Sequence, residues 1–334
     1  MVAGCTQASS ISQASPAAAA SSAATEELRC DLPYTDFAHT GFIHIPGGQF
    51  KADQAAQLEP DPARPDSFNR TVVKPQLYGP TGSSSESYDW PRSRWVPVGR
   101  ALVSPDGASY TYSEVIPNPA SLGLGGPPPL GTRVHLVDVA TGTDTVIYQT
   151  PAVLAAAWFG PSAVYLTEKV SDADTATAFR LLQLDPTRQV ATLVLGGAAA
   201  GPGPFTIDGS ALWIMAPDPA NPKAPGTVLR LALTGGAGTV WYQQPAGFAQ
   251  FLGLDPQAHP VIATWTGADG DPGKTVVVTA PGSATALAAQ GFTEMVTDHH
   301  GMWLNGTGVW LASGSGAVKK VAPGIGGALL GACG

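Results

Sequence analysis

Residues 103–107 read Val-Ser-Pro-Asp-Gly and are followed by Tyr110 and Tyr112, and this stretch decides the fold. Aspartate can accept hydrogen bonds from the backbone of its own turn, and glycine tolerates a positive φ. The stretch therefore predicts a tight turn between a strand at 101–103 and a strand at 110–112. An aromatic residue shortly after such a turn can pack between neighbouring sheets.

Pairs of short β-rich runs recur along the rest of the chain, and their first turns fall near residues 106, 160, 208, 256 and 300. The spacing is 44 to 54 residues, which is the size of a four-stranded propeller blade. A β-sandwich would give similar strands but would not require this period. We therefore predict an all-β protein that forms a single β-propeller.

The segment between Asp31 and Gly99 is less regular. We expect strands at 41–45 and 88–98, and a long excursion rich in Pro and Asp at 51–80. This segment should supply one further blade, which a strand from residues 325–332 completes. The prediction is about six four-stranded blades, although five or seven would also fit the spacing.

The overall composition supports this fold class. The 334 residues include 40 glycines and 31 prolines, which is too many breakers for long helices, and the hydrophobic share of 44% argues against general disorder. The net charge of −8 provides no basic field, so we expect no nucleic-acid partner. No stretch offers about 18 consecutive apolar residues, so we expect membrane contact only through an N-terminal lipid.

The first residues resemble a targeting signal. Residues 1–5, Met-Val-Ala-Gly-Cys, resemble the end of a bacterial lipoprotein signal, with Cys5 as the site of lipid attachment. Residues 6–25 contain 8 Ala and 6 Ser and no charge, which is typical of a flexible tether. We expect a disordered tether over 1–29, a propeller domain over 30–334, and an extracytoplasmic protein anchored to the bacterial cell surface. The alternative is an accidental match, because the charged and apolar parts of a signal peptide are absent.

Two cysteines remain, Cys30 just after the tether and Cys333 one residue from the end. Oxidised, they would bracket the whole domain, which fits an exported protein in an oxidising compartment. We therefore predict a Cys30–Cys333 disulfide. The alternative is a pair of buried free thiols.

The turn at 104–107 with Tyr110 and Tyr112 resembles the repeat of TolB-like β-propellers. A lipid-anchored propeller with this layout is similar to exported bacterial lipoproteins. The repeat extends over 101–323, but the later copies keep only Asp-Gly or a looser turn. The resemblance implies the fold and leaves the activity open, because propellers include binding modules, lyases and hydrolases.

The most conspicuous polar cluster is Asp298-His299-His300, followed by Gly301. One imidazole could act as a metal ligand or general base with Asp298 orienting it. The alternative is a further copy of the first turn, with both histidines at its surface. Adjacent histidines in a strand point to opposite faces, so we expect no shared metal ion. We predict neither a metal nor a cofactor.

The tryptophans provide a second candidate site. Trp158, Trp213, Trp303 and Trp310 fall inside expected strands and should pack between blades. In contrast, Trp90 and Trp95 lie beside Arg92 and Arg94, and we expect these four residues to be exposed and to form a binding surface.

No GxSxG elbow, Walker A loop, HExxH motif or dinucleotide fingerprint occurs. We therefore favour a monomeric, non-enzymatic binding module or scaffold of the cell envelope, with a protein or glycan as its partner. The alternative is an exported lyase or hydrolase with an axial site that uses His299 or His300. A third hypothesis is a purely structural role in an envelope assembly.

Overall fold

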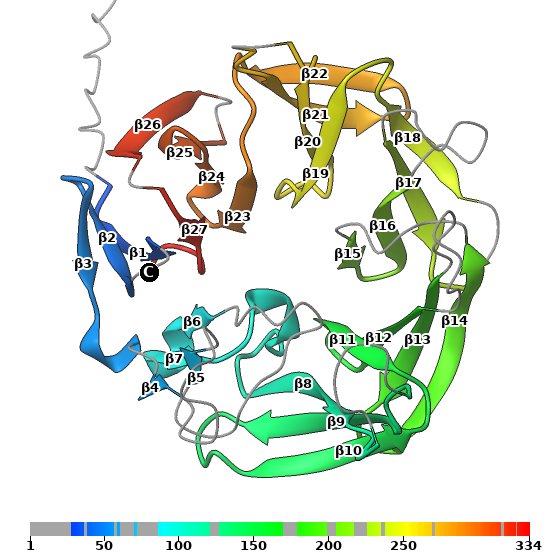
Figure 1. The fold of residues 1–334 in the computed structure, drawn as a ribbon. Coiled ribbons are helices and arrows are strands. Elements are labelled where there is room, and N and C mark those ends of the chain that lie inside the picture. The colour runs from blue at the N-terminus through cyan, green and yellow to red at the C-terminus, as the bar shows by residue number, and fades with distance from the viewer. Residues whose placement is uncertain are drawn as a thin grey trace, which may run out of the picture.

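The computed structural model describes residues 28–36, 39–56, 59–60, 70–71, 86–120, 127–169, 179–198, 205–216, 226–234, 238–268, 271–314, 317–324 and 326–334. Residues 1–27 of the expected tether, with Cys5, and most of the excursion at 51–80 lie outside these ranges. Among the described residues, none belongs to a helix with the length and apolarity needed to cross a bilayer. The strands are arranged in a ring of sheets (Figure 1).

Five four-stranded antiparallel sheets make up most of the ring, which confirms the all-β prediction. The first sheet joins β27 (Ala328–Leu329), β1 (Cys30–Thr35), β2 (Thr40–Ile45) and β3 (Gln49–Ala52). The other four run in chain order: β11 (Leu154–Phe159), β12 (Val164–Lys169), β13 (Phe179–Asp185) and β14 (Val190–Ala198); β15 (Phe205–Asp208), β16 (Ala211–Ala216), β17 (Thr227–Ala232) and β18 (Thr239–Gln243); β19 (Phe248–Leu254), β20 (Pro260–Trp265), β21 (Lys274–Ala280) and β22 (Ser283–Ala288); β23 (Glu294–Asp298), β24 (Gly301–Asn305), β25 (Gly308–Ala312) and β26 (Val318–Pro323).

A sixth sheet has three strands, β8 (Ser109–Ile116), β9 (Gly131–Asp138) and β10 (Asp144–Thr150). The strand predicted at 101–103 is wrong. A 3₁₀ turn, η3 (Arg100–Leu102), is followed by a single bridge between Val103 and Tyr110. The backbone here is satisfied locally, because the Leu102 amide donates to the carbonyl of Gly99.

The strand predicted at 88–98 is interrupted. It divides into β6 (Ser87–Asp89), a 3₁₀ turn η2 (Trp90–Arg92) and β7 (Arg94–Val96). Pro91 provides no amide for a ladder, and Ser93 adopts a left-handed conformation with φ of 49°. The β6–β7 pair lies in the ring between the β1–β3 sheet and the β8–β10 sheet (Figure 1). Beside it are η1 (Gln54–Ala56), β4 (Glu59–Pro60) and β5 (Arg70–Thr71).

Hydrophobic cores lie between neighbouring sheets. Tyr165 and Leu181 of one sheet pack with Leu212 and Ile214 of the next. Corresponding clusters join the other pairs of successive four-stranded sheets, and Leu32 packs against Trp303 where the last sheet meets the first. Burial between blades therefore provides most of the stabilisation of the ring.

The two chain ends meet in one sheet, which confirms the predicted closure. In β27, Leu329 pairs with Tyr34 and Ala328 pairs with Thr35 of β1. The Leu330 amide also donates to the carbonyl of Pro33 at 2.9 Å. The ring is thus closed by strand pairing between residues about 300 positions apart.

Candidate functional site

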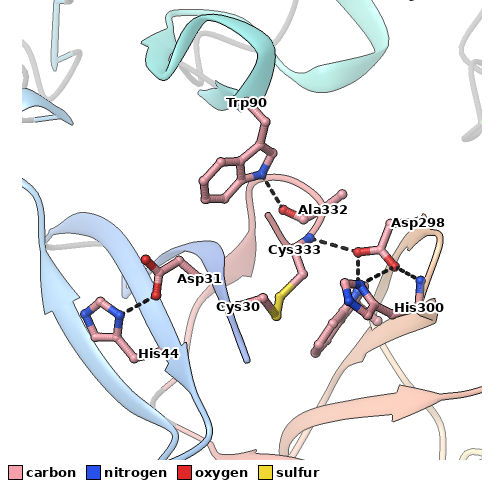
Figure 2. The surroundings of a disulfide bond; sticks show 9 residues. Cys30, Asp31, His44, Trp90, Asp298, His300, Ala332 and Cys333 are labelled. Atoms are coloured by element: carbon pink, nitrogen blue, oxygen red, sulfur yellow. Dashed lines mark hydrogen bonds and ion pairs between the residues drawn. A yellow bond between two sulfur atoms is a disulfide. The ribbon is translucent and has the colours of Figure 1, made fainter. Parts of the chain in front are cut away.

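The turn between β23 and β24 contains Asp298, His299 and His300. Asp298 Oδ1 accepts the His300 amide at 2.7 Å, and Oδ2 accepts Trp303 Nε1 at 2.7 Å. The Cys333 amide donates to the same Oδ2 at 2.9 Å (Figure 2). The carboxylate, whose side chain is only 7% exposed, therefore ties the turn both to its own blade and to the C-terminal segment.

The two imidazoles lie on the same side of this turn. Their ring centroids are 3.8 Å apart, with planes tilted by 40°. Adjacent histidines in a strand would point to opposite faces, but His299 and His300 lie in the turn, as expected for a further copy of the first turn. Asp298, His299 and His300 each place one potential ligand atom within 4.8 Å of the other two.

The same turn recurs without histidines in another blade. Asp208 ends β15, and its Oδ2 accepts Trp213 Nε1 at 2.6 Å. In both copies the tryptophan follows the aspartate by five residues and is fully buried. An aspartate followed five residues later by tryptophan is therefore the turn signature that the sequence offered, and Trp213 and Trp303 occupy the core as predicted.

The disulfide between Cys30 and Cys333 lies beside the Asp298 turn (Figure 2). Its Cα atoms are 5.7 Å apart. Next to it, the backbones of Asp31 and Gly334 exchange two hydrogen bonds of 3.1 and 3.3 Å. The predicted pairing of the two cysteines is thus present, at the seam where the chain ends close the ring.

Trp90 and Trp95 are half-buried instead of exposed. Both rings pack against Phe42, with centroids 5.8 and 5.2 Å away, and Tyr88 contacts both indoles. Trp90 Nε1 donates to the carbonyl of Ala332 at 2.7 Å and Trp95 Nε1 donates to Asp53 at 2.9 Å. This aromatic cluster fills the space between β2 and the β6–β7 pair.

The two arginines of the expected binding surface also make internal contacts. Arg92 donates to the carbonyl of Asp106 at 3.0 Å and to the buried Asp89 carboxylate at 3.4 Å. Arg94 is exposed, and one of its guanidinium nitrogens donates to the carbonyl of Val139. The four residues therefore join the β6–β7 pair to its neighbours.

A polar cluster that the sequence did not reveal surrounds His135 in β9. Its Nδ1 lies 2.9 Å from Asp144, its Nε2 lies 3.3 Å from Glu114, and its ring stacks on Tyr112. Tyr112 donates its hydroxyl to Asp144 at 2.6 Å. Burial raises the pKa of the Tyr112 phenol, and the hydrogen bond to Asp144 raises it further. The residues come from β8, β9 and β10, so only strand pairing brings them together.

An open groove of about 770 Å³ lies between the β8–β10 and β11–β14 sheets. It is lined by turn residues that include Pro105, Phe159, Pro161, Pro186 and Arg188. Its two aspartates, Asp106 and Asp185, are each held by backbone amides of their own turn. Both carboxylates in the groove are therefore engaged by their own turns.

Comparison with known proteins supports the fold alone. No protein-family model and no curated protein sequence matches the chain. Among solved structures, a puromycin-hydrolysing peptidase of Mycobacterium tuberculosis is similar, with a TM-score of 0.53, 14% identity, and coverage of 89% of this chain and 54% of that one. This similarity supports the β-propeller assignment.

Two further structures show weaker similarity. An oligogalacturonate lyase in complex with manganese has a TM-score of 0.48 and 16% identity, over 66% of this chain and 63% of that one. TolB from Acinetobacter baumannii has a TM-score of 0.42 and 11% identity, over 72% and 66%. The chain thus spans 54 to 66% of the length of these three structures.

Proposed function

We propose that this protein is a non-enzymatic binding module of the bacterial cell surface and that its ligand is another protein. The ligand adds a strand to the outer edge of the β11–β14 sheet. The observation that carries this proposal is the composition and exposure of β14.

Strand β14 is the outermost strand of its sheet and contains no charged residue. Val190 and Leu193 are 54% and 59% exposed. An outer edge presents backbone donors and acceptors, and proteins ordinarily protect such edges with lysine, proline or a short strand. Strand β26 follows that rule, since it contains Lys319 and Lys320 and ends at Pro323. Strand β14 has neither lysine nor proline, although its register with β13 shifts between Leu193 and Leu195.

The outer strands of the next two blades extend this surface. Neither β18 nor β22 contains a charged residue, and Val240 of β18 is 50% exposed. We define the outer rim as β14, β18 and β22. An uncharged rim with exposed aliphatic side chains favours a partner that presents an apolar β-strand.

The tryptophans provide no fully exposed platform for a glycan. All eight lie among the described residues, and each is buried or half-buried. Stacking on a sugar requires the open face of an aromatic ring. Trp90 and Trp95, which the sequence suggested as part of a binding surface, pack against Phe42 and Tyr88.

The contacts of Asp298 give it a structural role. Its two carboxylate oxygens accept three hydrogen bonds, from His300, Trp303 and Cys333. The alternative of an axial lyase or hydrolase site would use the imidazoles of His299 or His300 in the same turn.

The surface location rests on the lipoprotein-like Cys5 and the tether. The disulfide between Cys30 and Cys333 adds support, because such bonds persist in oxidising compartments. The proposed module would thus be exposed to other envelope proteins.

A photo-crosslinking residue placed at Leu193 of the full chain tests the proposal in envelope extract. We expect a saturable crosslink to one protein, and none from the same residue placed at Lys319 of β26. Excess wild-type chain should compete with the crosslink. A Leu193→Lys variant should compete at least tenfold less well, because it places a charge on the edge.

Val146→Lys is the matched control, since Val146 is 42% exposed on β10, an outermost strand that is not part of the rim. It should compete as well as wild type if β14 is the docking edge. Equal competition by Leu193→Lys and wild type, or a crosslink to glycan alone, would overturn the proposal.

A further inference from the structure

We infer that the turn Asp298-His299-His300 binds one divalent transition-metal ion of the zinc class. The inference is independent of the outer rim. It rests on the comparison of this turn with its copy in the β15–β18 sheet and on the spacing of the three side chains.

The two turns share the parts that the fold requires. Asp208 and Asp298 each end an inner strand, and the indole five residues further on donates to each. The two linking residues differ, because Gly209-Ser210 in one turn corresponds to His299-His300 in the other. Gly209 has a φ of 46°, a conformation that neither histidine adopts, so the two turns share the Asp–Trp hydrogen bond rather than one backbone geometry. That hydrogen bond forms without imidazoles at 209–210, so the histidines are not required for it.

One of these imidazoles is also poorly satisfied by the protein. His300 Nδ1 is buried and has no hydrogen-bond partner among the described residues. Leaving a buried polar nitrogen unpaired destabilises a fold. A metal ion would supply the missing partner.

The spacing of the ligand atoms suits such an ion. His300 Nδ1 lies 3.4 Å from Asp298 Oδ1. Ligands at about 2.0–2.1 Å from a tetrahedral Zn²⁺ are separated by about 3.3 Å. His299 brings a third ligand atom within 4.8 Å of both, and its side chain is exposed. Two imidazole nitrogens and one carboxylate oxygen form a three-ligand site with a fourth position open to water.

The surroundings would hold the carboxylate in place. Asp298 Oδ2 accepts the indole of Trp303 and the amide of Cys333, which leaves Oδ1 toward the imidazole. Outer partners of this kind fix the orientation of a metal ligand. Through Cys333, the site is also joined to the disulfide at the seam (Figure 2).

Titration of the untagged full chain with Zn²⁺ in a calorimeter tests the inference. We expect one ion per chain and no comparable binding of Mg²⁺, which prefers oxygen ligands. Co²⁺ in the same site should give the visible absorption of a tetrahedral complex. The double variant His299→Gly/His300→Ser removes both imidazoles and keeps the Asp298–Trp303 hydrogen bond, so it should fold and should bind Zn²⁺ at least about tenfold more weakly.

The control is His259→Ala, which removes the single imidazole paired with Asp255 in the corresponding β19–β20 turn. It should leave the affinity unchanged. Equal affinity of wild type and the double variant, or no Zn²⁺ binding by wild type, would overturn the inference. Either result leaves the rim proposal intact.

Discussion

Asp208 and Asp298 each accept a hydrogen bond from an indole five residues along the chain, within a turn between an inner strand and its neighbour. Both carboxylates hold a buried tryptophan in one orientation, so the residue that shapes the turn also fixes the core between blades. Trp310 offers the contrasting case, because its Nε1 is buried and has no partner among the described residues.

Substitution by phenylalanine should lower the free energy of unfolding more at Trp303 than at Trp310. Trp303→Phe removes a hydrogen bond to a largely buried carboxylate and should lower the free energy of unfolding by about 1–3 kcal/mol more than Trp310→Phe. Trp303 is fully buried and Trp310 is half-buried, so a greater loss of packing at Trp303 adds to this difference. Urea unfolding of the two variants measures the difference, and equal destabilisation would show that the Asp298 bond contributes nothing.

A second residue-scale prediction concerns Asp106. The hydroxyl of Ser104 and the amide of Ala108 donate to this carboxylate and hold its pKa below the ordinary value. Because the pKa of Asp106 is lower in the folded protein than in the unfolded chain, the ionised carboxylate stabilises the fold at pH values above the unfolded pKa of about 4. This stabilisation is lost as the pH falls through the lower pKa of the folded protein. In the Ser104→Ala variant, the pKa of Asp106 should rise toward its ordinary value. A carbon-detected NMR titration measures this pKa, and an unchanged value would show that Ser104 does not lower it.

At the scale of elements, the seam unites β27, β1 and the disulfide. Strand pairing there involves only two residues of β27, so the covalent link should add substantially to closure. A bridge over 303 positions restricts the unfolded chain by up to about 5 kcal/mol.

Reduction of the disulfide should therefore lower the midpoint of thermal unfolding, and Cys30→Ser/Cys333→Ser should show the lower midpoint with or without reductant. Differential scanning calorimetry measures both. A midpoint insensitive to reductant in wild type would show that β27 closes the ring unaided.

The elements also show what the sequence could predict. The turn residues near 106, 208 and 300 gave the period, because Asp and Gly fix a turn locally. The β6–β7 pair at 87–96, which forms a two-stranded wedge in the ring, was not predicted in this form, since its position depends on contacts with Phe42 from a distant strand. The placement of His299 beside His300 likewise required the turn geometry, and the exposure of Leu193 required knowing that β14 is outermost.

On the scale of the whole molecule, six sheets and one two-stranded wedge form a ring whose sides are unlike. The seam, with its disulfide and the Asp298 turn, holds the chain ends together. The outer rim of β14, β18 and β22 lacks the charges that β26 carries. This asymmetry is the basis of the proposal that a partner binds at the rim.

Hydrogen–deuterium exchange of the full chain, with and without the protein captured through Leu193, tests binding at the rim most directly. Strand addition pairs edge amides that otherwise exchange freely. The account predicts slower exchange across residues 190–198 in the complex and no change at 298–300. Protection at 298–300 with unchanged exchange in β14 would contradict it.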